Sequence, residues 1–222
     1  MFERHAQLLG TCLEKLFQAK VLVAGVGGLG CTVSSLLVRM GVGQIHLLDK
    51  GVVDEPDLNR QILYDEFDLG RKKVAVAKEK LSRLGSYAKI FDLDLNLDFD
   101  FCLPNVDVVV DCLDSFEAKF ALDSLCERKG VPLVHAGVQG FCGQVSTILP
   151  GSVRLKRLFR TVPKEETIRQ VYPPLVSLIA SLQVHEVIKL LCDEEPNLVG
   201  KIFLVDLSSM RFEVIKLEGV KQ

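Results

Sequence analysis

Apolar and polar positions follow one another in blocks that predict strands and helices in alternation along the first 140 residues. Short apolar runs predict strands at 21–24, 44–48, 90–93, 106–110 and from 132 onward. Helical spacing of apolar residues predicts helices at 29–40, 71–84 and 116–128. Apolar strands joined by helices are typical of a parallel sheet that is covered on both faces. The pattern therefore predicts an α/β fold, a doubly wound Rossmann-like sheet that is mainly parallel.

The pattern changes after residue 140. We expect a strand at 143–149, a long apolar helix at 175–191, and a terminal hairpin of antiparallel strands at 201–205 and 212–217. The stretch at about 150–172 is polar, basic and without clear periodicity, which is typical of a lid or binding loop. Because no linker or repeat interrupts the chain, we expect one domain over 1–222, with a crossover loop at about 150–172.

Composition narrows the class of protein. The 222 residues are 48% hydrophobic and 25% charged, with a net charge of −2, which argues against nucleic-acid and membrane-surface binding. No uninterrupted apolar stretch has the length of about 18 residues that crosses a membrane, and the first residues do not resemble a signal peptide. The seven cysteines are scattered and never spaced CxxC, which predicts a reduced, cytoplasmic protein without structural zinc.

The most informative motif is Gly-Val-Gly-Gly-Leu-Gly at 25–30, between the first strand and the first helix. Glycines permit a tight turn close to phosphate, and the helix N-terminus supplies unpaired N–H groups. Asp49 ends the next strand, where a carboxylate accepts hydrogen bonds from ribose. We therefore expect an adenine nucleotide beside Gly25, Gly27, Gly28, Gly30 and Asp49. An NAD-dependent oxidoreductase uses the same turn and stays an alternative here.

Further charged residues indicate polyphosphate chemistry. We place four groups at the carboxyl ends of the strands: the segment Asp57-Leu58-Asn59-Arg60-Gln61, then Lys73, the pair Asp111 and Asp114, and Arg4. Each has a structural explanation by itself, since Arg60 and Lys73 suit a surface and Asp114 or Ser115 suits a helix cap. Together they set two cations and two carboxylates around the nucleotide turn. A nicotinamide enzyme does not need that combination, whereas catalysis at phosphorus does.

These residues resemble a known family over nearly the whole chain. The matching segments are Arg4-His5-x-x-Leu8-x-Gly10, Gly25-x-Gly27-Gly28-Leu29-Gly30, Leu58-x-Arg60-Gln61, Gly70-x-x-Lys73, Asp111-Cys112-x-Asp114, Pro174-Leu175-Val176 and Ser181-Leu182-Gln183. The chain resembles the HesA/MoeB/ThiF adenylyltransferases, relatives of the ubiquitin-activating enzymes.

The resemblance implies a homodimer that binds ATP and Mg²⁺ and adenylates a small ubiquitin-fold sulfur-carrier protein ending in Gly-Gly. It implies that Asp49 holds the ribose and that Arg60 and Lys73 hold the phosphates, within a binding segment that includes Asn59 and Gln61. It implies further that Asp114 binds Mg²⁺ and that Arg4 reaches into the partner subunit's site. By this resemblance the catalytic residues are Arg4, Arg60, Lys73 and Asp114.

Several positions depart from the family pattern. The register of its first zinc-binding CxxC pair falls on Arg154 and Arg157, and no cysteine follows residue 217, so we expect no zinc. The crossover loop has no cysteine, and we expect Cys112 and Cys142 to be packed and inert. The family's Asn residues are replaced by Asp57 and Ser115. Asp57 adds negative charge beside a triphosphate, which weakens ATP binding or recruits a second cation.

Other functions and partners stay open at this point. Residues 151–170 carry six basic and two acidic side chains, a net charge of +4, which suits either a solvated loop or a lid that attracts an acidic carrier. In the second case, arginines take the place of zinc. The departures also permit a catalytically degenerate, carrier-binding dimeric module. A tRNA-modifying dehydratase of the same fold fits less well, and the carrier's pathway, thiamin, molybdopterin, cysteine or another, is undecided.

Overall fold

The computed structural model describes residues 2–93, 103–159 and 170–217, and their strands form one sheet in the order β3-β2-β1-β4-β5-β6-β7-β8. The parallel strands are β1 (Lys20–Ala24), β2 (Gln44–Leu48), β3 (Lys89–Leu93), β4 (Val108–Asp111) and β5 (Leu133–Gln139). The antiparallel strands are β6 (Cys142–Ile148), β7 (Lys201–Asp206) and β8 (Arg211–Lys216). The predicted fold class is confirmed, including the antiparallel C-terminal strands.

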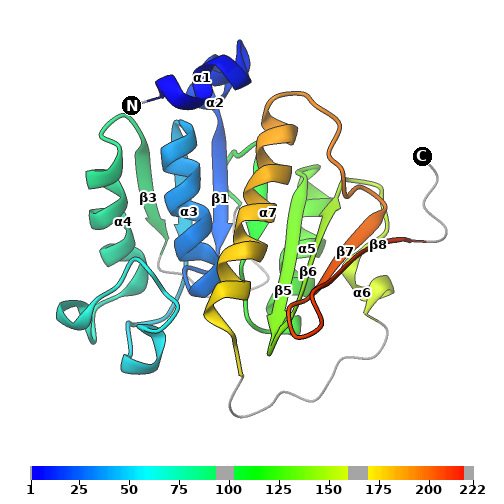
Figure 1. Cartoon of the computed structure of the whole chain (residues 1–222). Helices are drawn as coiled ribbons and strands as arrows, with labels where there is room; N and C mark the ends of the chain where they lie inside the picture. The colour runs from blue at the N-terminus through cyan, green and yellow to red at the C-terminus, as the bar shows by residue number, and fades with distance from the viewer. Residues whose placement is uncertain (1, 94–102, 160–169, 218–222) are drawn as a thin grey trace.

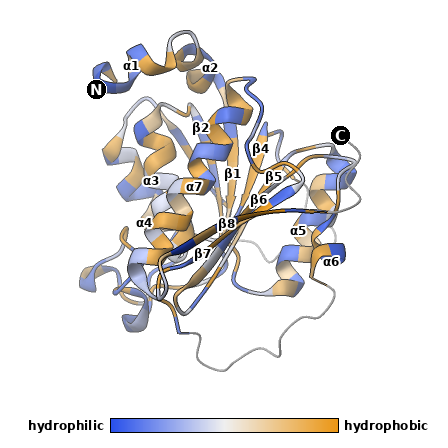
Figure 2. Cartoon of the chain, turned by 45° about the vertical axis from the view of Figure 1, so that its right-hand side comes forward, coloured by the Kyte–Doolittle hydropathy of each residue, from blue (hydrophilic) through white to orange (hydrophobic). Residues whose placement is uncertain are grey.

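Helices cover both faces of this sheet (Figure 1). On one face lie α3 (Gly28–Met40), α4 (Lys73–Leu84) and α7 (Pro173–Leu191). On the other face lie α5 (Phe116–Lys129) and α6 (Leu155–Leu158). The two apolar layers explain why the central strands are mainly hydrophobic, as Figure 2 shows for β1 and β4. The exceptions in these two strands are Lys20, the first residue of β1, and Asp111, the last residue of β4.

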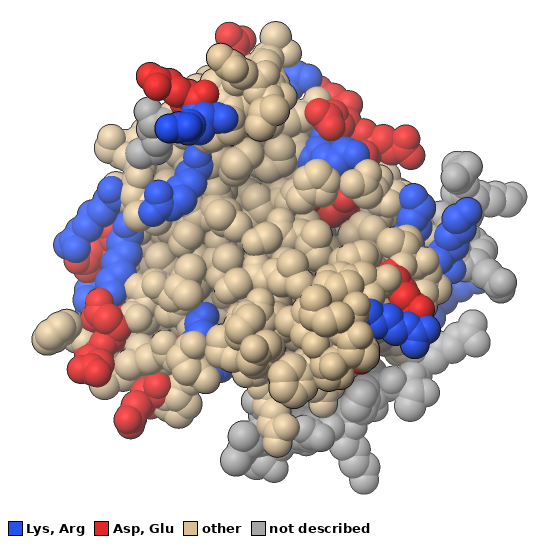
Figure 3. All heavy atoms as spheres, viewed as in Figure 1, with Lys and Arg blue, Asp and Glu red and all other residues tan. Residues whose placement is uncertain are grey.

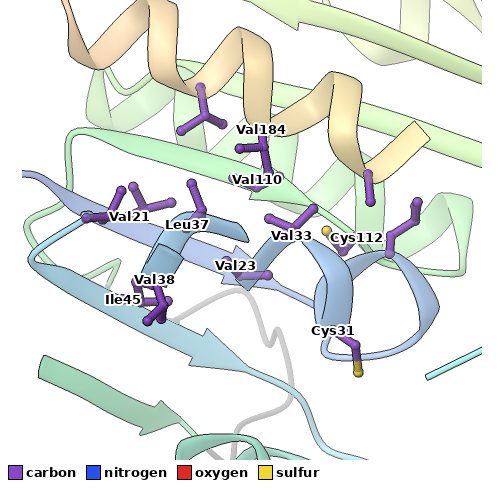
Figure 4. Close-up of a cluster of buried hydrophobic side chains, with 14 of the residues drawn as sticks. Val21, Val23, Cys31, Val33, Leu37, Val38, Ile45, Val110, Cys112 and Val184 are labelled. Carbon is purple, nitrogen blue, oxygen red and sulfur yellow. The ribbon is translucent and has the colours of Figure 1, made fainter. Parts of the chain in front are cut away.

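The larger core lies between α3, α7 and the sheet. Figure 4 shows Val21 and Val23 of β1 against Val33 and Leu37 of α3, with Val184 of α7 completing the layer. All of these side chains except Val184 are fully buried. The intervening residue of β1 is a leucine, and its side chain faces the second core under α5. Alternation along β1 therefore feeds both layers, as expected for a strand in the middle of a doubly wound sheet.

Two N-terminal helices that the pattern did not predict are α1 (Glu3–Leu9) and α2 (Cys12–Gln18). They lie at the amino ends of β1 and β2, where the Gly43 N–H donates to the Leu16 carbonyl at 2.9 Å. A Cβ on Gly43 would stand 1.9 Å from the Phe17 carbonyl oxygen, so this close approach requires glycine. Both helices are only seven residues long, which is too short for a clear helical periodicity.

Helix α7, predicted as a long apolar helix at 175–191, is by length and composition long and apolar enough to cross a membrane. About half of this helix is buried inside the protein. Its Gln183 side chain donates to the backbone carbonyls of Asp111 (2.9 Å) and Val134 (3.2 Å), which ties the helix to β4 and β5. These contacts identify α7 as a core helix of the sheet.

A disulfide joins Cys12 of α2 to Cys192 at the end of α7, with 5.1 Å between the Cα atoms. The expectation of a fully reduced protein is therefore wrong for this pair. The two residues are 180 positions apart, and only the packing of α2 against α7 brings them together. The spacing of cysteines along the chain holds no trace of such a contact.

Removing this disulfide is expected to lower the free energy of unfolding by about 2–4 kcal/mol, because the cross-link closes a long loop in the unfolded chain. The measurement is urea unfolding of the wild type and Cys192→Ser under non-reducing conditions. Cys142→Ser, at an exposed free cysteine, is the matched control and should unfold like the wild type. Equal midpoints with and without dithiothreitol would contradict the prediction.

Candidate functional site

The glycine turn between β1 and α3 is shaped by close backbone contacts. Gly25 has φ of +91°, and a Cβ there would stand 2.5 Å from the Cys112 carbonyl oxygen. A Cβ on Gly30 would stand 1.9 Å from the Gly25 carbonyl oxygen. Gly27 is the N-cap of α3 and has no side chain to cap it, so the first-turn N–H groups are free to meet a ligand. The turn thus has the form that binds phosphate.

Asp49 joins this turn to the end of β2. Its carboxylate accepts hydrogen bonds from the N–H groups of Val26 and Gly51, both at 2.7 Å. These bonds fix the carboxylate beside the turn, where the remaining lone pairs of its oxygens suit hydroxyl donors. The Tyr64 hydroxyl donates to the Val26 carbonyl at 2.8 Å from the other side. The sequence pattern missed Tyr64, because the contact spans 38 positions and no local motif marks it.

Val176 also contacts the turn unexpectedly. Its Cγ1 lies 3.1 Å from where a Cβ on Gly28 would stand, so the start of α7 packs directly on the first turn of α3. This contact gives a physical role to the Pro174-Leu175-Val176 segment: it fixes the helix whose N-terminus faces the candidate site. The available signal was the motif itself, not any periodicity.

The structure gathers three of the predicted nucleotide-binding residues, Lys73, Arg60 and Gln61, around Asp57. Lys73, the first residue of α4, places its Nζ 2.8 Å from Asp57 Oδ2. Gln61 Nε2 donates to Asp57 Oδ1 at 2.5 Å, and one Arg60 guanidinium nitrogen lies 3.5 Å from the same oxygen. The Asn59 side chain accepts from Arg60 at 3.0 Å, which orients the guanidinium.

This cationic group also lies against the glycine turn. The Arg60 Cγ stands 3.4 Å from the position of a Cβ on Gly28, and Gln61 Nε2 is 3.7 Å from that of Gly27. The backbone N–H of Lys73 donates to the Gly51 carbonyl at 3.0 Å, two residues after Asp49. The nucleotide turn, the acid of β2 and both cations therefore form one site.

Asp114 and Asp111 have different surroundings, although both follow β4 closely in the chain. Asp114 is exposed in the loop before α5, two residues after the Cys112 carbonyl that packs on Gly25. Ser115 is the N-cap of α5, and its hydroxyl accepts from the Ala118 N–H at 3.2 Å, as one of the structural explanations anticipated. Asp114 is therefore an exposed carboxylate in the loop between β4 and α5.

Asp111, by contrast, is fully buried beneath α5. The prediction that its carboxylate lies at the nucleotide turn is therefore wrong. Its two carboxylate oxygens lie 3.0 and 3.1 Å from Lys119 Nζ, and His135 Nδ1 is 2.7 Å from Oδ2. Burial alone raises the pKa of Asp111, but Lys119 and His135 outweigh it and hold the pKa below its ordinary value. Burial lowers the pKa of His135, so its imidazole is neutral near pH 7.

This buried group predicts a loss of stability on the acid side of neutrality. Because the pKa of His135 is lower in the folded protein than in the unfolded chain, the unfolded chain binds more protons below about pH 6.5. The thermal midpoint is therefore expected to fall between pH 7.5 and pH 5.5, and to fall less in His135→Gln. Burial also lowers the pKa of His46, so some pH dependence will persist. An equally steep fall in His135→Gln would contradict the role of His135.

Arg4 does not lie at the carboxyl edge of the sheet, and that expectation is corrected. It is exposed on α1, at the amino ends of β1 and β2, while the glycine turn follows the carboxyl end of β1 (Figure 1). The sequence places Arg4 only by its motif, and a short helix at the opposite edge decides its position. Within one chain, Arg4 is therefore separated from Lys73 and Arg60.

Comparisons with known proteins establish the family of the chain. The family model described as the ThiF family matches residues 3–222. The chain belongs to the ThiF family. It is 34% identical over 212 residues to the molybdopterin-synthase adenylyltransferase of Haemophilus influenzae, covering 92% of this chain and 87% of that protein.

Other relatives agree. The SAMP-activating enzyme E1 of Haloferax volcanii is 30% identical over 209 residues, covering 90% of this chain and 77% of that protein. A crystal structure of E. coli MccB has a TM-score of 0.87 at 24% identity, over 97% of this chain and 71% of that chain. The MccB likeness establishes the shared fold.

The cysteines of this ThiF-family chain divide by burial. Burial raises the pKa of Cys31 to about 12 and that of Cys112 well above its ordinary value, so both thiols are inert near neutrality. Cys142, expected to be packed, is exposed at the start of β6, because its strand position turns outward at the edge of the β5–β6 hairpin. Cys102 lies outside the described residues.

The start of the crossover segment is anchored by arginine. Arg154 pairs with Asp123 of α5 and, at 2.7 Å, with Glu127, and it donates to the Asp123 carbonyl at 2.6 Å. Its charge is therefore held by α5, while Arg157 and Lys156 are exposed. Leu155 of α6, between Arg154 and Lys156 in the sequence, is fully buried. The described start of the crossover segment therefore has regular structure. Lys164, Glu165, Glu166 and Thr167 lie outside the described residues.

Two predictions concern metal ions: a Mg²⁺ ligand at Asp114 and the absence of zinc. Within residues 2–93, 103–159 and 170–217, no group of three or more His, Cys, Asp or Glu side chains is arranged to hold a metal ion. The expectation of no zinc stays a prediction. Mg²⁺ sites on polyphosphates, however, commonly use one or two carboxylates together with phosphate oxygens and water, and Asp114 suits that requirement.

Proposed function

We propose that this ThiF-family protein adenylates the C-terminal Gly-Gly carboxylate of a small ubiquitin-like sulfur-carrier protein, using ATP. The observation that carries the proposal is the meeting of Lys73, Arg60 and Gln61 beside the glycine turn. A fixed pair of cations at a phosphate-binding turn suits catalysis at phosphorus. The names of the two relatives, an adenylyltransferase and a SAMP-activating E1, support the same reaction class.

In the proposed reaction, a carboxylate oxygen of the carrier attacks the α-phosphorus of ATP. The bond from that phosphorus to the bridging oxygen breaks, and the electron pair leaves with pyrophosphate, giving the acyl-adenylate. No general base is needed, because the nucleophile is already ionised. The protein therefore acts by positioning the reactants and by stabilising charge.

Each proposed role follows from the position of a side chain. Asp49, fixed by Val26 and Gly51, accepts the ribose hydroxyls, and the N–H groups of α3 after Gly27 receive phosphate oxygens. Arg60 and Lys73 stabilise the charge that develops toward pyrophosphate. Asp114 holds Mg²⁺, which when bound neutralises phosphate charge.

We further propose a homodimer in which Arg4 serves the partner subunit's site. Arg4 lies on α1, at the opposite edge of the sheet from the glycine turn, so it cannot reach the site of its own chain. An uncharged surface extends over α3 and α7 (Figure 3), where Leu36, Leu178 and Leu182 are only partly buried. Such a surface suits association between subunits.

The protein is proposed to act as a single nucleotide-binding domain over 1–222, with a crossover loop at about 150–172. We place it in the cytoplasm, where ATP and Mg²⁺ are supplied. No thiol transfer by this chain is proposed. Arg157 and Lys156 are the described cations that stay available to an acidic carrier.

A degenerate binding module is the second candidate, and the ion pair between Asp57 and Lys73 favours it, because that pair occupies a phosphate ligand. An NAD-dependent oxidoreductase leaves Lys73, Arg60 and Asp114 without a role.

Calorimetric titration with MgATP and with NAD, followed by ATP–pyrophosphate exchange with candidate carriers, separates the three. Micromolar ATP binding and carrier-dependent exchange support the adenylyltransferase. Tight NAD binding identifies the oxidoreductase, and nucleotide-independent carrier binding identifies the module.

A further inference from the structure

Asp57 lies at the centre of the cationic group that the proposed function assigns to phosphates. The side chains of Asp57 and Lys73 are each 13% exposed, so their 2.8 Å ion pair is largely withdrawn from water. Withdrawal from water strengthens the pair relative to one on the surface. Lys73 therefore already has an anionic partner before any nucleotide arrives.

The backbone fixes this carboxylate in place. Asp57 ends the 3₁₀ turn Glu55–Asp57, and its Oδ2 accepts a hydrogen bond from the Asp54 N–H at 3.2 Å. The Asp54 carboxylate accepts in return from the Glu55 N–H at 2.9 Å. This reciprocal capping holds Asp57 through its own turn, independently of the cations. The anion is fixed, and the long side chains of Lys73 and Arg60 gather around it.

Gln61 adds an independent observation. It is 2% exposed, its Nε2 faces Asp57, and its Oε1 is buried without a hydrogen-bond partner among the described residues. A carboxylate only accepts hydrogen bonds, so the Nε2 end of the Gln61 amide faces Asp57 and the Oε1 end points away from it. A buried acceptor without a partner, beside a glycine turn, is a group that a ligand or water would satisfy.

We propose that Asp57 is a placeholder anion that positions Lys73 and Arg60 in the nucleotide-free protein and lowers the affinity of the site for free ATP more than its affinity for metal-complexed ATP. The proposal rests on the proposed function. Two cations and one carboxylate leave a net charge of +1 at the phosphate site, where an asparagine would leave +2. A divalent cation removes two negative charges from ATP, so the complexed nucleotide meets less repulsion from Asp57.

Asp57→Asn is expected to bind metal-free ATP about tenfold more tightly than the wild type, which corresponds to about 1.4 kcal/mol. The gain for MgATP is expected to be about twofold, so the preference for the complexed nucleotide shrinks. Asparagine keeps the size and a side-chain acceptor but removes the charge. Asp57 is in this sense a positioning residue, acting through Lys73 and Arg60.

The experiment is calorimetric titration of the whole protein with ATP in EDTA and with ATP in excess MgCl₂. Asp54→Asn is the matched control: it makes the same charge change on the same turn, and its side chain caps the turn instead of pairing with Lys73. It should bind both forms like the wild type. The proposal is overturned if Asp57→Asn keeps the wild-type ratio of affinities, or if Asp54→Asn shows the same gain.

A second readout needs no nucleotide. Acetylation of Lys73 by an N-hydroxysuccinimide ester, followed by mass spectrometry, is expected to be faster in Asp57→Asn, because the ammonium loses its anionic partner. An unchanged rate would overturn the placeholder role. If the wild type binds no ATP but Lys73 is acetylated faster in Asp57→Asn than in the wild type, the proposed function fails. If the wild type binds ATP and the ratio stays unchanged, only the role of Asp57 fails.

Discussion

Lys73→Ala is expected to lower carrier-dependent ATP–pyrophosphate exchange by about 10²- to 10³-fold, the size of effect seen when one charge-stabilising donor is removed from an active site. Lys73 is the first residue of α4 and lies beside Gly51. Its side chain is less exposed than that of Arg60, the other cation near the glycine turn. Its charge opposes the negative charge that develops as pyrophosphate leaves. Exchange of radioactive pyrophosphate into ATP, at saturating MgATP and carrier, measures the effect.

Two further variants separate chemistry from folding. Lys78→Ala removes the same charge from the same helix at a surface pair with Asp92, and exchange should stay within about twofold of the wild type. Lys73→Ala/Asp57→Asn removes both partners of the buried pair, so it should recover any stability that the single variant loses without recovering exchange. Wild-type exchange by Lys73→Ala would refute the assignment of this lysine to the phosphates.

Lys119→Met is expected to destabilise the fold by about 3–5 kcal/mol, because it leaves the carboxylate of Asp111 buried without its cation. Lys119 is 6% exposed and Asp111 is fully buried. Beyond Asp111, the ammonium donates to the Ala136 carbonyl at 2.8 Å, so two acceptors lose their donor together. In the wild type, burial holds the pKa of His135 below its ordinary value, so Lys119 carries the positive charge that pairs with Asp111 near pH 7. Urea unfolding followed by circular dichroism gives the free energy directly.

Lys129→Met, at the exposed end of the same helix, is the control and should change stability by less than about 0.5 kcal/mol. Lys119→Met/Asp111→Leu removes the pair as a whole, and we expect it to be more stable than Lys119→Met alone. If Lys119→Met were as stable as the wild type, Lys119 and Asp111 would not form a stabilising buried ion pair.

Local sequence patterns predict most of the helices and strands of this chain. Apolar runs and helical spacing located the strands and the long helices α3, α4, α5 and α7 within two residues of their observed bounds wherever both bounds were predicted, and β2 agrees at both ends. These elements bury wide apolar faces, so their periodicity is strong. The short helices α1, α2 and α6 were missed, because elements of four to seven residues have too few turns to show a period.

The candidate site was predictable in part. The glycine turn, Asp49 and the start of α4 at Lys73 follow from local rules for turns and helix ends, and the structure brings them together with Arg60 and Gln61. Two aspartates that are three positions apart, however, have opposite surroundings. Asp114 is exposed at the turn, whereas Asp111 serves the core beneath α5.

The sequence by itself determined the ThiF-type sheet, its glycine turn and the types of residue available for phosphate, because these depend on periodicity, turn chemistry and motif order. Tertiary structure alone decided which side chains meet. Only packing pairs Asp57 with Lys73, Arg154 with Asp123, and Cys12 with Cys192. Such contacts depend on how distant elements dock on the sheet, and local sequence patterns carry no record of that docking.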